Sequence, residues 1–107
     1  MPRWIPVAKA DDLPVGTGKE VFVDNRILAL FRLEDGRLCA LDGICPHNGG
    51  PLAEGTLSGC VVTCPWHGWQ FDVTTGQHQL NPRIVQPGFP VRLHEGRIEV
   101  ELPDESG

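Results

Sequence analysis

Short apolar and β-branched runs alternate along the chain with glycine- and proline-containing turns, which interrupt every stretch that could grow into a long helix. The segments that we predict to be strands are residues 19–24, 26–33, 37–42, 59–64, 69–73 and 89–102. Only residues 8–14 could hold a helical turn. Turn signals recur about every 8 to 12 residues, which favours an antiparallel all-β domain, a β sandwich or barrel.

Two of the turns predict hairpins. Asn25 separates the first two runs, and Glu95-Gly96 lies in the middle of the last one, where "RIEVEL" alternates between polar and apolar residues. Side chains of a strand alternate between its faces. In residues 37–42 this places Leu38, Ala40 and Asp42 on one face, and Cys39 and Leu41 on the other.

Length and composition limit the classes of protein. The chain has 107 residues, so we expect one domain over residues 1–107, and its 40% hydrophobic content is typical of a globular protein. A net charge of −5 argues against a nucleic-acid partner. No apolar run approaches the roughly 20 residues of a membrane span, and the N-terminus does not resemble a signal peptide. We therefore expect a soluble, cytoplasmic protein.

Residues 43–72 hold three of the four cysteines and two of the four histidines. Cys45 and His47 are two positions apart, Cys64 and His67 are three apart, and sixteen residues separate the pairs. Prolines and glycines surround both pairs, so we place them on two loops, about 43–52 and 64–71, that follow predicted strands. Two such loops facing each other would enclose a site with two sulfur and two nitrogen ligands.

The sequence "CPH", followed after sixteen residues by "CPWHGW", resembles the Rieske motif, C-x-H then C-x-x-H. The resemblance extends to "GGPL" after the first pair and to "GWQFD" after the second. The chain is similar to the small Rieske ferredoxins of ring-hydroxylating dioxygenase systems, and also to the small subunit of assimilatory nitrite reductase. The resemblance implies one 2Fe-2S cluster, with Cys45 and Cys64 on the buried iron and the Nδ1 atoms of His47 and His67 on the outer iron.

The charge of such a cluster determines how readily it accepts an electron. Two ferric ions, two sulfides and two thiolates sum to zero charge, so reduction is easier than for a cluster held by four thiolates. High-potential Rieske proteins add a disulfide between the loops and serine and tyrosine hydroxyls near the cluster. Gly50 and Trp66 match the positions of that disulfide. Trp69 matches the position of the serine, and Phe71 that of the tyrosine. Because these donors are missing, the resemblance implies a low-potential Rieske protein.

This resemblance implies a function in electron transfer. We expect a monomeric one-electron carrier that passes electrons from a flavin-dependent reductase to a terminal oxygenase, and that is not an enzyme itself. The first alternative is the Rieske small subunit of nitrite reductase, bound to its large subunit. The second is a zinc-stabilised interaction module, since Cys₂His₂ is a common zinc ligand set. The interleaved Cys-His, Cys-His order favours the cluster over zinc.

The remaining cysteines and histidines have simpler interpretations. We expect Cys39 and Cys60 to be buried strand residues that act as small hydrophobes. A disulfide between the two is the alternative. His78 and His94 have no partner at ligand spacing, so we expect both on the surface.

Two further features border the expected site. Trp66 lies between two ligands, where packing and a role in cluster shielding or partner contact are about equally favoured. We interpret residues 81–90 as a surface loop. The resemblance implies that a proline-containing loop lies against the cluster at this place in the chain, which makes Pro82 and Pro87 candidates to cover it.

Overall fold

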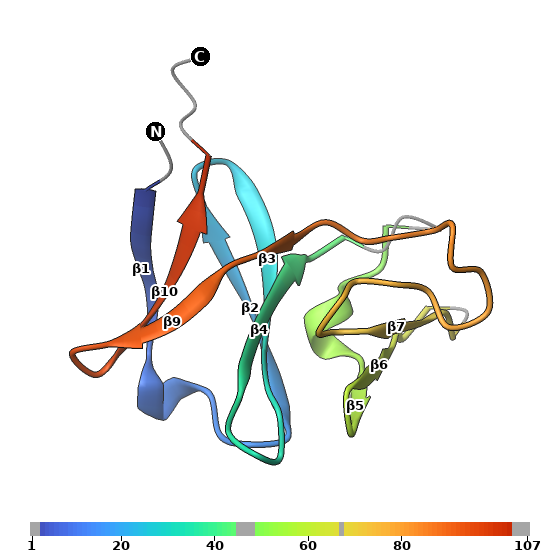
Figure 1. Cartoon of the computed structure of the whole chain (residues 1–107), viewed down its shortest axis with the longest axis horizontal. Helices are drawn as coiled ribbons and strands as arrows, with labels where there is room; N and C mark the ends of the chain where they lie inside the picture. The colour runs from blue at the N-terminus through green and yellow to red at the C-terminus, as the bar shows by residue number, and fades with distance from the viewer. Residues whose placement is uncertain (1–2, 45–48, 67, 104–107) are drawn as a thin grey trace.

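The chain is seen here in a computed structural model, which describes residues 3–44, 49–66 and 68–103. These residues form three antiparallel sheets (Figure 1). The first contains β1 (Arg3–Lys9), β10 (Arg97–Leu102) and β9 (Val91–His94), in that order. The second has the order β2 (Thr17–Val23), β3 (Arg26–Arg32), β4 (Leu38–Asp42) and β8 (Gly88–Phe89). The third has the order β5 (Thr56–Ser58), β6 (Val61–Thr63) and β7 (Gln70–Asp72). Two single-turn 3-10 helices, η1 (Ala10–Asp12) and η2 (Leu52–Glu54), complete these elements.

Both predicted hairpins are present, and their turns explain why. Asp24 and Asn25 join β2 to β3 with φ of 50° and 61°. Glu95 and Gly96 join β9 to β10 with φ of 52° and 79°. A two-residue turn with two positive φ angles matches the right-handed twist of the paired strands. The predicted helical turn within residues 8–14 is η1.

The central strands of the second sheet, β3 and β4, are buried on both faces because apolar residues occupy both of their faces. One face packs against β1, β9 and β10 to form the basal core: Leu13, Val21, Leu28, Leu30, Ala40, Ile98, Val100 and Leu102. The other face packs against η2 and the third sheet to form the cluster-side core: Ala29, Phe31, Leu33, Leu41, Leu52, Ala53, Val62, Cys64, Phe71 and Val73. As predicted, Cys39 and Leu41 lie on one side of β4, and Leu38 and Ala40 on the other.

The prediction of an antiparallel all-β fold is confirmed, although some strands differ from those expected. β1 was not predicted from the sequence, because Pro6 interrupts its run of residues. The pairing of β1 with β10 also shifts register between Pro6 and Ala8. The run 59–64 contains a turn and then β6, because Gly59, with φ of 60°, reverses the chain from β5. In the parts of the chain that the structure describes, no helix is long and apolar enough to cross a membrane.

Candidate cluster-binding site

Of the four predicted ligands, Cys64 is the one whose surroundings can be described. Cys45, His47 and His67 lie outside the described residues. Cys64 follows β6, is 1% exposed, and belongs to the cluster-side core. Among the described residues, no group of three His, Cys, Asp or Glu side chains could hold a metal ion. A buried thiol at the start of this loop fits the inner ligand that the sequence predicts.

The second cluster loop, residues 64–69, is closed at its base. The backbone N–H of Cys64 donates to the carbonyl of Trp69 at 2.7 Å, directly beyond the pairing of Thr63 with Gln70. Gly68 has φ of 76°, a left-handed conformation that glycine adopts readily. Trp66 is 52% exposed. The loop therefore starts in the core at Cys64 and reaches the surface two residues later.

The first cluster loop also has a closed base. It leaves β4 after Asp42, and Ile44 forms an isolated antiparallel bridge with Pro51. The backbone N–H of Leu52 donates to the carbonyl of Gly43 at 3.0 Å. The residues at the two ends of the first loop are thus paired with each other, as those of the second loop are.

Gln86 connects the first loop to a third segment, residues 77–87, and sequence reasoning missed it. Its side chain is 3% exposed, and its Nε2 donates to the carbonyls of Asp42 at 2.7 Å and Ile44 at 2.6 Å. The backbone N–H of Gln86 donates to the carbonyl of Gly76 at 2.6 Å. Gly76 has φ of 80°, and a Cβ there would lie 2.1 Å from the Gln86 carbonyl oxygen. Gly76 therefore permits the close approach that brings Gln86 to the first loop.

The prediction that His78 lies on the surface is wrong. The residue is 7% exposed, because it forms an isolated bridge with Phe71 that turns its side chain into the fold. Its ring stands edge-to-face against the rings of Trp69 and Phe71, with centroid separations of 4.5 and 5.2 Å. The sequence carried no signal for this burial, because the contacts depend on how residues 77–87 pack. His94 lies on the surface as expected, with its side chain 53% exposed.

A family model for the Rieske [2Fe-2S] domain matches residues 3–98. The chain belongs to the Rieske family. Among curated relatives, it is 38% identical over 102 residues to Ferredoxin CarAc of Metapseudomonas resinovorans, covering 91% of this chain and 92% of the relative. It is 32% identical to the ferredoxin component of the naphthalene 1,2-dioxygenase/salicylate 5-hydroxylase systems of Ralstonia sp, covering 94% and 96%.

Solved structures show the same Rieske fold. One comes from the complex of reduced oxygenase and oxidized ferredoxin in carbazole 1,9a-dioxygenase: TM-score 0.80, 36% identity, and 91% of both chains covered. Another is a putative NADH-dependent nitrite reductase small subunit from Mycobacterium tuberculosis. Its TM-score is 0.89 at 29% identity, with 97% of this chain and 98% of that chain covered.

A Rieske domain carries a Rieske-type 2Fe-2S cluster, and what the structure shows of this chain fits that cofactor. Each of the two loops has a closed base, and a buried cysteine stands at the base of one. When bound, the cluster supplies one-electron redox chemistry. Between the two metal centres considered from the sequence, the family assignment favours the cluster over zinc.

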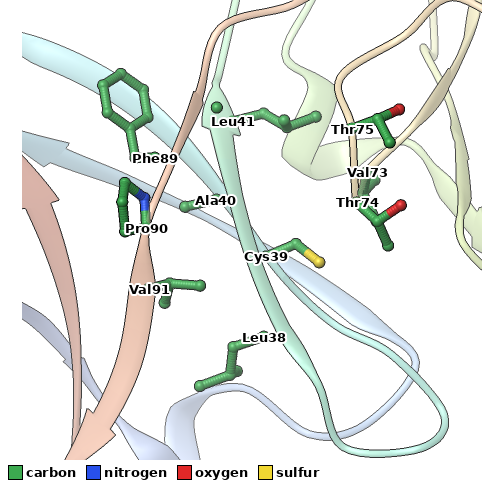
Figure 2. Close-up of a pocket in the computed structure, with 11 residues that line it drawn as sticks. Leu38, Cys39, Ala40, Leu41, Val73, Thr74, Thr75, Phe89, Pro90 and Val91 are labelled. Carbon is green, nitrogen blue, oxygen red and sulfur yellow. The ribbon is translucent and has the colours of Figure 1, made fainter.

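The remaining cysteines of this Rieske protein are not joined by a disulfide. Cys39 lies in β4 as expected, but it is half-buried and not fully buried, and this burial raises the pKa of its thiol. Cys60 lies in the turn before β6 and not in a strand, where its Sγ is 3.7 Å from Nη2 of Arg37. Cys39 also lines a groove of about 370 Å³ between β4, residues 73–75 and residues 88–91 (Figure 2). Its described lining has no carboxylate, histidine or basic side chain, so the groove offers no acid–base pair.

Proposed function

We propose that this Rieske protein is a one-electron carrier, which receives electrons from a flavin-dependent reductase and delivers them to a terminal ring-hydroxylating oxygenase. The observation that carries this proposal is the likeness to ferredoxin components over more than nine tenths of both chains. The related ferredoxin seen with its oxygenase supports an oxygenase as the electron acceptor. The reductase, a monomeric state, a cytoplasmic location and a single domain over residues 1–107 are part of the same proposal.

The proposed ligand set is Cys45, His47, Cys64 and His67. The burial of Cys64 supports the assignment of the cysteines to an inner iron. The histidines would then hold the outer iron. We expect about two iron and two sulfide per chain after anaerobic purification, and an EPR signal with average g below 2 after reduction. One zinc and no iron would contradict this ligand chemistry.

Exposed apolar side chains beside the proposed ligands support electron transfer at this end of the molecule. Ile44, which precedes Cys45, is 38% exposed, and Trp66, which precedes His67, is 52% exposed. Aromatic residues are enriched where proteins dock, and an electron passes more readily when the redox centre lies near the partner. We therefore propose that Trp66 contacts the electron partner.

Electron transfer to a purified ring-hydroxylating oxygenase tests this function. The reduced protein is mixed with the oxidised oxygenase, and the change in visible absorbance that accompanies reoxidation of the protein is followed by stopped flow. Trp66→Ala should slow the transfer by roughly tenfold, as loss of an interface aromatic would. Leu93→Ala is the matched control, because Leu93 is 51% exposed but lies on β9 in the first sheet. Absence of transfer from the native protein would overturn the proposed acceptor.

The small subunit of nitrite reductase is a second candidate, favoured by the TM-score of 0.89. Such a subunit would remain bound to a large partner chain, whereas a carrier must dissociate after each transfer. Size-exclusion chromatography with a nitrite reductase large subunit and, separately, with the oxygenase distinguishes them. A stable complex with the former and no transfer to the latter would establish the second candidate.

A further inference from the structure

His78 is buried, and its two ring nitrogens differ in their hydrogen bonding. Its Nδ1 accepts the backbone N–H groups of Leu80 at 3.0 Å and Asn81 at 3.1 Å. A nitrogen that accepts hydrogen bonds carries no proton, so the ring hydrogen is on Nε2. This Nε2–H donor is buried, and it has no hydrogen-bond partner within the described part of the chain.

The surroundings of the imidazole indicate where that donor acts. An unpaired buried donor is unfavourable, whereas an apolar side chain could fill the same space without that cost. Both neighbouring rings, Trp69 and Phe71, belong to the second cluster loop or to the strand that follows it, and both meet the imidazole at 85°. An N–H group directed toward an aromatic face is weakly stabilised. The imidazole therefore contacts the side of the second cluster loop through these two rings, and residues 80 and 81 through its Nδ1.

We propose that His78 is a positioning residue for the cluster. Its Nδ1 fixes the third segment, and its Nε2–H stabilises the second cluster loop through Trp69, which closes that loop onto Cys64. Gln86, in the same segment, holds the first loop. One segment would therefore position both cluster loops, through a buried donor directed to each.

This arrangement has an electrostatic consequence. A neutral imidazole is a dipole whose positive end is the N–H group, which this proposal directs to the side of the second cluster loop. Reduction adds one negative charge to the cluster, so a nearby positive dipole end favours the reduced state. His78 therefore raises the reduction potential above the value that the same fold would have with an apolar residue at this position. The inference rests on the proposed ligand set but not on the choice of electron partner.

Three substitutions separate the two roles of the ring. In His78→Asn the side-chain oxygen can replace Nδ1, and in His78→Gln the side-chain amide can replace Nε2–H. His78→Phe keeps a ring but removes both groups. Protein-film voltammetry measures the potential, and hydrogen exchange with mass spectrometry measures the protection of the Leu80 and Asn81 amides. His94→Gln, at an exposed histidine, is the matched control.

We expect His78→Phe and His78→Asn to shift the reduction equilibrium by roughly threefold to tenfold toward the oxidised state, about 30 to 60 mV. His78→Gln should keep the native potential. Exchange at Leu80 and Asn81 should increase roughly tenfold in His78→Phe and His78→Gln, and remain native in His78→Asn. The control should change neither quantity.

Iron and sulfide content, measured for each variant, separates this inference from the proposed function. Absence of the cluster from the native protein would overturn both the proposed function and this inference. An intact cluster with the same potential in His78→Asn and His78→Gln would overturn the donor role, and equal exchange in these two variants would overturn the acceptor role. If His78→Phe does not fold, the Asn and Gln pair still decides each point.

Discussion

The two cores share a sheet but differ in what surrounds them. The basal core contains only aliphatic side chains and lies between two sheets whose main strands have five to seven residues (Figure 1). The cluster-side core lies against strands of three residues each, and it contains Cys64. The buried polar side chains of the described residues, His78 and Gln86, are both associated with this side.

This difference indicates how each side is stabilised. Long paired strands bury apolar area without help, so the basal core should be stable in the absence of the cofactor. Three-residue strands bury little, so the cluster-side core depends on specific hydrogen bonds and on the cluster that joins its loops. The following predictions test whether the two sides can be perturbed separately.

The largest expected effect is that of Cys64→Ser. Removal of the inner ligand should eliminate the cluster and loosen the cluster-side core, because metal binding is coupled to the order of the loops. Iron analysis should show loss of cluster, and hydrogen exchange should show loss of protection in β6 and β7 with protection retained in β10. Full iron content in this variant would exclude Cys64 as a ligand.

A cavity in the basal core should give the opposite result. Leu30 is fully buried in β3, so Leu30→Ala should reduce the free energy of unfolding by about 2 to 5 kcal/mol. Urea denaturation measures this change. The visible spectrum and the reduction potential of the folded variant should remain native. A changed potential would show that the two cores are coupled through the shared sheet.

Gln86→Leu should have a smaller effect on stability. The substitution removes the donor to the Asp42 and Ile44 carbonyls, at about 1 to 3 kcal/mol for a buried group left without a partner. The loss should appear in urea denaturation, together with faster exchange near residues 42–44. Gln77→Leu is the control, because the side chain of the exposed Gln77 donates a long hydrogen bond, 3.3 Å, to the Pro82 carbonyl. Equal losses in both variants would mean that Gln86 does not hold the first loop.

Phe71→Tyr should affect the potential far more than the stability. The resemblance to Rieske proteins places a tyrosine hydroxyl of high-potential members at this position. A new hydrogen bond to a ligand sulfur, worth about 1 to 2 kcal/mol more in the reduced state, would raise the potential by roughly 40 to 90 mV. Voltammetry checks this result. Phe31→Tyr, at a fully buried phenylalanine of β3, is the control and should leave the potential unchanged.

The features that the sequence predicted correctly are those that depend on residues close together in the chain. Both hairpins, the two faces of β4 and the family follow from local alternation, turn residues and ligand spacing. The roles of Gln86 and His78 do not, because they depend on contacts between distant segments: Gln86 reaches a carbonyl 44 positions earlier. β1 was missed because its proline concealed a strand that pairs with the far end of the chain. The ligand roles of Cys45, His47, Cys64 and His67 stay predictions.

Because β3 is buried on both faces, the difference between a buried and a wet face cannot fix the register of its pairing. In a sheet with one wet face, a slip of one residue would expose apolar side chains to water. Here it would only exchange Leu28 and Leu30 with Ala29 and Phe31 between two dry cores. The volume of the paired side chains must therefore fix the register: Gly18 pairs with Phe31, and a Cβ at Gly18 would lie 2.9 Å from the Phe31 ring. The geometry of the turn at Asp24 and Asn25 fixes it as well. In this hairpin, two exposed turn residues help to set the strand register, which in other sheets is set by the cost of exposing apolar side chains to water.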